Sequence, residues 1–187
     1  MEQGVWRCAC PGQGVLKPVS LAAKLPAGQC AACEGTMLDL ATYRGWRDQA
    51  DRPDAALPDM VIHGLLAVED WPGARSCPRC ARLMQRLRVS TELPDFRIDR
   101  CGSCQIVWLD RGEWAALAAN GLAWRLDEVL SDGWQRQLQR EEVRARREEA
   151  LRERHGDDCM DELARVRQWL AGQDRRDELI ALLRAGW

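Results

Sequence analysis

Eight of the nine cysteines fall into four close pairs, and this spacing is the main chemical signal in the chain. A C-x-C pair is followed after 19 residues by a C-x-x-C pair; after a further 43 residues come two more C-x-x-C pairs, 20 residues apart. Two pairs about 15–20 residues apart are typical of a four-thiolate zinc site, because each tight turn places two sulfurs on one side of the backbone and the hairpin between them returns the second turn. The sequence therefore predicts two Zn²⁺ ions, one held by Cys8, Cys10, Cys30 and Cys33 and the other by Cys77, Cys80, Cys101 and Cys104.

Other uses of paired cysteines fit this pattern less well. The first eight residues lack a signal-peptide profile and no apolar run reaches about 18 residues, so we expect a cytoplasmic protein without a membrane span, in which disulfides are rare. A thioredoxin-like enzyme would need one C-x-x-C motif in a βαβ setting. An iron–sulfur cluster also uses four cysteines, but hairpin-separated pairs favour zinc. The remaining cysteine, Cys159, stands alone in a polar stretch and is interpreted as a bystander.

The two halves of the cysteine pattern repeat beyond the cysteines themselves. The segment Cys33-Glu34-Gly35-Thr36-Met37-Leu38-Asp39 aligns without a gap with Cys104-Gln105-Ile106-Val107-Trp108-Leu109-Asp110, so that a hydrophobic residue, Leu and Asp occupy the same offsets. Such self-similarity indicates two copies of one unit rather than a single eight-cysteine cluster.

The second copy resembles a known family. The segments Cys77-Pro78-Arg79-Cys80, Cys101-Gly102-Ser103-Cys104 and Trp108-Leu109-Asp110-Arg111-Gly112-Glu113 are similar to the CPxCxxxL and CxxCxGxWLDxGE motifs of bacterial transcription-factor-IIB-type zinc ribbons. The resemblance is close over 75–120, loose over 5–50, and leaves the last third uncovered. Three positions depart from the pattern: Ile106 replaces a glycine, Met37 replaces the tryptophan, and the short Cys8-x-Cys10 pair leaves open whether both of its cysteines reach the metal. The resemblance implies a fold and not a role in transcription.

Local patterns predict the elements of the second copy. The stretches 83–90 and 96–100 are expected to form a hairpin that turns at 91–95, and Trp108-Leu109 a short third strand. Asp110, with Glu113 three residues later, is expected to cap a helix that ends near Gly121. This structural role accounts for both carboxylates without a catalytic one.

The overall expectation is a small zinc-stabilised α+β protein followed by a helical region. We predict a first, degenerate zinc ribbon at 1–52, a linker or packing segment at 53–74, a second ribbon at 75–122 and a charged α-helical tail at 123–187. Each ribbon is expected to combine short β-hairpins with one helix. Within the tail, helices are expected at 134–155, from Asp157 or Asp158 to Leu170, and at 174–184.

Composition and motifs leave three functional hypotheses. No phosphate-binding loop, nucleophile elbow or open zinc position is evident, so we expect a non-enzyme with no small-molecule substrate. The favoured hypothesis is a protein–protein adaptor that binds its partner through the C-terminal helices. The second is nucleic-acid binding through an arginine-rich face formed by Arg79, Arg82, Arg86 and Arg88, although 27 basic against 29 acidic residues exclude a general polycation. The third is a thiolate redox sensor that loses zinc on oxidation.

Overall fold

The computed structural model describes residues 6–49, 68–90 and 96–186, and the chain divides into two compact units, Met1–Leu138 and Gln139–Trp187. The expected turn at 91–95 lies outside the described residues, as does most of the segment 53–74. No helix in the described ranges is both long and apolar enough to cross a membrane.

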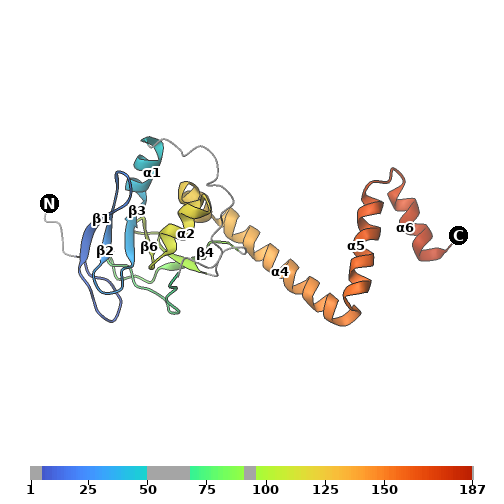
Figure 1. The fold of residues 1–187 in the computed structure, drawn as a ribbon, viewed down its shortest axis with the longest axis horizontal. Helices are drawn as coiled ribbons and strands as arrows, with labels where there is room; N and C mark the ends of the chain where they lie inside the picture. Colours follow the sequence, from blue (N-terminus) through green and yellow to red (C-terminus); the bar gives the residue numbers. More distant parts are fainter. Residues whose placement is uncertain (1–5, 50–67, 91–95, 187) are drawn as a thin grey trace. The chain divides into compact units, whose positions relative to one another are not determined.

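A six-stranded antiparallel sheet forms the first unit (Figure 1). Each ribbon contributes three strands and then a helix, as the repeat predicts. The first supplies β1 (Leu16–Ala22), β2 (Leu25–Cys30), β3 (Thr36–Asp39) and α1 (Leu40–Gln49), and the second supplies β4 (Gln85–Arg88), β5 (Arg97–Cys101), β6 (Ile106–Leu109) and α2 (Glu113–Ala119). The strand order β1-β2-β3-β6-β5-β4 places the two ribbons edge to edge through β3 and β6.

The junction between the ribbons is locally symmetric. In the antiparallel β3–β6 pair, Met37 lies opposite Trp108, and these two residues occupy the same position in the internal repeat. Thr36 pairs with Leu109 and Leu38 with Val107, as a two-fold relation between the copies requires. The duplicated sequence therefore folds as a paired unit with one continuous sheet.

Alternation along β3 and β6 divides the buried side chains between two faces. Met37, Ile106 and Trp108 belong to a cluster that contains the paired cysteines, whereas Leu38, Val107 and Leu109 belong to a larger aliphatic core. Successive strand residues point to opposite faces of a sheet, so one face carries the metal-binding cysteines and the other packs against helices. The larger core includes residues of the helical segments that follow the sheet.

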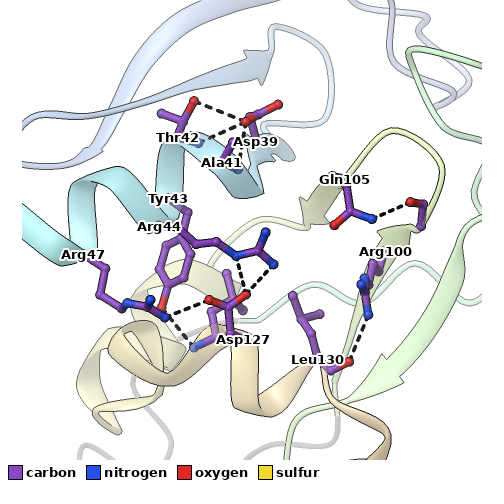
Figure 2. Close-up of polar contacts among 12 residues, drawn as sticks. Asp39, Ala41, Thr42, Tyr43, Arg44, Arg47, Arg100, Gln105, Asp127 and Leu130 are labelled. Atoms are coloured by element: carbon purple, nitrogen blue, oxygen red, sulfur yellow. Dashed lines mark hydrogen bonds and ion pairs between the residues drawn. The ribbon is translucent and has the colours of Figure 1, made fainter.

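The segment after α2 forms ion pairs and a hydrogen bond with α1, the helix of the first ribbon. A 3-10 helix, η1 (Leu122–Arg125), leads into α3 (Leu126–Val129). Figure 2 shows Asp127 of α3 between Arg44 and Arg47 of α1, with Nη2 of Arg44 at 2.8 Å and Nη1 of Arg47 at 2.7 Å from its carboxylate oxygens. The buried Tyr43 hydroxyl accepts a hydrogen bond from the Leu126 N–H at 3.1 Å. Residues far apart in sequence thus hold the first unit together.

Three further helices follow, close to the expected positions. They are α4 (Asp132–His155), α5 (Asp157–Ala171) and α6 (Arg176–Ala185). The first residues of α4 belong to the first unit: Trp134 Nε1 donates to the Val89 carbonyl at 2.9 Å, and the Gln135 amide exchanges two hydrogen bonds with the backbone of Arg88 on β4. The α+β fold with a helical C-terminal region is confirmed.

Candidate metal centres

The first group of cysteines comes from two turns of the first ribbon. Cys8 and Cys10 precede β1, Cys30 ends β2 and Cys33 precedes β3. The four Sγ atoms lie within 4.8 Å of one another. The Sγ atoms of Cys8 and Cys33 are 3.7 Å apart, and those of Cys10 and Cys30 are also 3.7 Å apart. The structure therefore brings both cysteines of the shortened Cys8-x-Cys10 pair into the site.

The second group is built in the same way by the second ribbon. Cys77 and Cys80 precede β4, Cys101 ends β5 and Cys104 precedes β6. Their Sγ atoms also lie within 4.8 Å of one another, with Cys80 and Cys101 3.7 Å apart. The two groups are thus separate, as the internal repeat predicts.

The turns that carry the cysteine pairs share features of backbone geometry. In three of the pairs, the Sγ atom of the first cysteine accepts a hydrogen bond from the backbone N–H two residues later. The N–H of Cys10 donates to Cys8 at 3.3 Å, that of Ala32 donates to Cys30 at 3.3 Å, and that of Arg79 donates to Cys77 at 3.4 Å. The residue directly after a C-x-x-C has a positive φ at Glu34, Ala81 and Gln105. Backbone donors of this kind stabilise thiolate, the form that binds metal.

The shortened first pair is compensated by a longer loop after it. The Cys8 N–H donates to the carbonyl of Gly14, six residues on, whereas the Cys77 N–H donates to that of Arg82, five residues on. A Cβ on Gly14 would lie 2.5 Å from the Sγ of Cys30, so this close approach requires glycine. The loop is therefore two residues longer after Cys10 than after Cys80, which is one more than the residue missing between Cys8 and Cys10.

Both groups fit a tetrahedral zinc ion. Four sulfurs at about 2.3 Å from one Zn²⁺ lie about 3.8 Å from one another, and the close sulfur pairs are 3.7 Å apart. Two four-thiolate groups, one per ribbon, match two zinc ions, and a set of four protein ligands leaves no open position on the metal.

One thiol in each group ionises near neutral pH. The Arg82 N–H donates to Cys80 and, against a smaller effect of burial, lowers the pKa of that thiol to about 7. At Cys10 burial raises the pKa, but hydrogen bonds from the Gly14 backbone and from neighbouring thiols outweigh it and lower the pKa to about 7. Burial raises the pKa of Cys33 to about 11. Zinc binding therefore displaces protons and weakens in acid.

Arg75, which precedes the second ribbon's first cysteine, contacts the first ribbon's site. Its side chain is 4% exposed; Nη1 lies 3.8 Å from the Sγ of Cys8, and Nη2 lies 2.6 Å from Oδ1 of Asp110. The guanidinium also lies 4.9 Å from the ring centre of Trp108. A buried cation beside four thiolates offsets the net charge of about −2 of a Zn(Cys)₄ centre. Sequence reasoning missed this role.

Asp110 differs from its expected role. It does not cap α2: Gly112 precedes that helix, and the Asp110 carboxylate instead accepts hydrogen bonds from Trp108 Nε1 at 2.9 Å, the Trp71 N–H at 2.9 Å and Arg75. The expected return contact from Glu113 is present, since its Oε2 accepts the Asp110 N–H at 2.7 Å. The buried Arg75 binds the Asp110 carboxylate in place of the N–H groups at the start of α2, because a buried, charge-assisted hydrogen bond is stronger than a capping hydrogen bond.

A third cluster of possible ligands consists of carboxylates from Asp70, Asp110 and Glu113. Asp70 is paired with Arg86, and Asp110 with Arg75. The fully buried Glu113 forms no ion pair with any cation in the described ranges, and burial raises its pKa to about 9. Because arginines already neutralise two of the three carboxylates, we interpret this cluster as an internal polar network.

The departures from the family pattern complement one another across the β3–β6 pair. Gly35 lies against the indole of Trp108, where a Cβ would come 2.6 Å from Cζ2. At the equivalent position of the second copy, Ile106 is buried in the same cluster as Met37. The copy with the large tryptophan is thus paired with a glycine, and the copy with methionine is paired with isoleucine.

Comparison with known families agrees with this geometry. A family model described as a transcription factor zinc-finger, of the TFIIB zinc-ribbon type, matches residues 76–120. Residues 76–120 thus match the TFIIB-type zinc-ribbon family. The match covers the second group of cysteines and α2, and the first group stands in a repeat of the same unit. Comparisons with curated proteins and with solved structures each found no match.

The four arginines predicted to bind nucleic acid lie on or beside the TFIIB-type ribbon. Arg79 Nη1 is 2.9 Å from Asp39 of the first ribbon, Arg82 donates to the Ser103 hydroxyl at 2.8 Å, and Arg86 is paired with Asp70. Arg88 lies on β4 beside Gln135. The side chains of Arg79, Arg82 and Arg86 therefore have acceptors within the protein, and contact of all four arginines with nucleic acid stays a prediction.

Proposed function

We propose that the chain is a non-catalytic adaptor, in which two zinc ribbons form a rigid scaffold and the C-terminal helices bind a protein partner. The observation that carries this proposal is the exposure of large apolar side chains on α5 and α6. Leu163, Trp169 and Leu183 are 55%, 54% and 60% exposed. Large apolar side chains exposed on charged helices are typical of protein interaction sites.

The zinc sites support a structural role for the metal. Four thiolates satisfy tetrahedral zinc, so no metal-bound water is available as a nucleophile. The buried sulfur-containing cluster includes only a few hydrophobic residues beyond the cysteines, and zinc supplies much of the folding free energy of ribbons this small. Metal binding therefore serves to hold the sheet rather than to transform a substrate.

Nucleic-acid binding is the competing proposal, and internal ion pairs weigh against it. Arg79 and Arg86 would have to leave Asp39 and Asp70 to contact phosphate. Such exchange removes part of the electrostatic gain that drives phosphate binding. A protein partner for the C-terminal helices requires no such exchange.

The test is native mass spectrometry of the tagged full chain purified gently from its own host. We expect a mass with two zinc ions and one discrete protein partner. A variant that ends after Leu138, the last residue of the first unit, should keep both zinc ions and lose the partner. A partner that stays with the truncated variant, or a nucleic acid in place of a protein, would contradict the adaptor role.

A further inference from the structure

A groove runs between α4 and α5 in the second unit. Its volume is about 790 Å³. It lies between the facing sides of the two helices, which are separated in sequence by Gly156. On α4 it is lined at intervals of three or four residues by Arg144, Arg147 and Leu151, and on α5 at similar intervals by Met160, Leu163 and Arg167. This spacing selects one side of each helix.

Apolar side chains form the floor of the groove. Leu151 and Met160 are half-buried, while Leu163 is more than half exposed, and Ala164 and Ala171 extend the surface along α5. No aromatic side chain lines it, which makes it a poor platform for stacking bases. The small alanines leave room for a third helix to approach, as in helix-in-groove recognition.

Arginines without acidic partners line the same groove. Arg144, Arg147 and Arg167 form no ion pair within the described part of the chain, whereas Arg146 and Arg165, outside the groove on the same two helices, are each paired with a glutamate one turn away. The acidic lining residue, Glu148, is paired with Arg152, which also binds Asp161 at 2.9 Å. The groove therefore carries an uncompensated positive charge beside an apolar floor.

We propose that this groove binds an acidic amphipathic helix of the partner protein. The partner's apolar side chains pack on Leu151, Met160 and Leu163, and its carboxylates pair with the three free arginines along the groove. Positive charge facing negative charge gives such an interface its specificity and orientation. This inference rests on the proposed adaptor function and names the class of partner.

Site-specific photocross-linking in the full zinc-loaded chain tests the groove directly. The photoreactive residue p-benzoylphenylalanine replaces Ala164 in the groove or, as a matched control on the outer face of α5, Arg165. We expect a cross-link from position 164 to an acidic segment of a protein with helical apolar spacing, and none from position 165. A cross-link to nucleic acid, to a second copy of this chain or to a segment without excess acidic residues would overturn the proposal.

A charge-reversal pair supplies an independent measurement. Arg144→Glu with Arg147→Glu should lower the cross-linking yield from position 164 about tenfold, since like charges then face each other across the interface. Arg154→Glu with Arg184→Glu makes the same change in net charge away from the groove and should leave the yield unaltered. Equal losses in both variants, with helix content unchanged by circular dichroism, would overturn the proposal. If native mass spectrometry shows a protein partner and position 164 cross-links to nothing, the groove proposal fails and the adaptor role stands.

Discussion

At the scale of single residues, the two ribbons are joined by complementary substitutions rather than by identical ones. Gly35 makes room for Trp108, and Ile106 is buried in the same cluster as Met37. Protein interiors are close-packed, so each enlargement on one side of the pair requires a reduction on the other. The difference between the copies is thus part of their packing.

Adding one methyl group at Gly35 tests this packing. Gly35→Ala places a Cβ 2.6 Å from Cζ2 of Trp108, and we expect the free energy of unfolding to fall by about 1–3 kcal/mol, as for overpacked cores. Urea unfolding with zinc in excess measures the change. Gly102→Ala is the control, because a Cβ there has no atom within 4 Å. Similar losses in both variants would contradict the account.

Arg75 is the residue that couples the TFIIB-type ribbon to the first metal site. Replacing it by methionine leaves the buried Asp110 without its cation and leaves Asp99 with Arg86 alone, and we expect a loss of about 3–5 kcal/mol in unfolding free energy. Arg111→Met removes a well-exposed arginine paired with Glu34 and should cost less than about 1 kcal/mol. Zinc release to a chelator should also begin at the Cys8 group in Arg75→Met. A variant as stable as Arg111→Met would refute this role.

Glu113 gives the fold a pH dependence of predictable sign. Its pKa is raised by burial from 4.5 to about 9, so it is protonated in the folded chain and ionised in the unfolded chain at neutral pH. The stability that it contributes is complete below its unfolded pKa and is lost as pH rises toward the folded pKa. Relative to Glu113→Gln, the wild type should lose about 1 kcal/mol per pH unit between about pH 6 and pH 8. Parallel unfolding curves for the two proteins across that range would disprove it.

At the scale of elements, local patterns predicted most of the secondary structure. The strands beside Leu87 and Ile98 and the helices of the C-terminal region appear close to their expected positions, because alternation and charge spacing are local signals. The pairing of β3 with β6 was not predicted, because the residues of one strand do not specify which edge it meets. The ion pair of Asp110 with Arg75 was missed for the same reason: the residues are 35 positions apart.

The contact between α4 and β4 protects an edge of the sheet. The Gln135 side chain satisfies both the N–H and the carbonyl of Arg88, at 3.2 Å and 2.9 Å. Gln135→Ala should therefore speed hydrogen exchange of the Arg88 amide by about five- to tenfold, for a loss of about 1 kcal/mol. Gln139→Ala, on the exposed part of the same helix, is the control. Unchanged exchange at Arg88 would show that the edge is protected by other means.

At the scale of the whole molecule, the metal-binding cysteines and the groove between α4 and α5 lie in different units. All eight metal-binding cysteines lie in the first unit, and the unpaired arginines and exposed apolar side chains of the groove lie in the second. The cysteine spacing alone predicted both groups, since the sulfurs of a zinc ribbon are set by short turns. The groove was not predicted, because it forms where one face of α4 meets one face of α5, and the sequence of each helix does not specify that contact.

Cobalt titration of the zinc-free full chain tests the central claim, two closed four-thiolate sites, most directly. We predict two equivalents of Co²⁺, each with the tetrahedral absorption and sulfur charge-transfer bands of four thiolates. Cys10→Ser should reduce the charge-transfer intensity of one equivalent and leave the other intact, because the two groups are separate. A single equivalent in the wild type, or no spectral change in Cys10→Ser, would contradict the account.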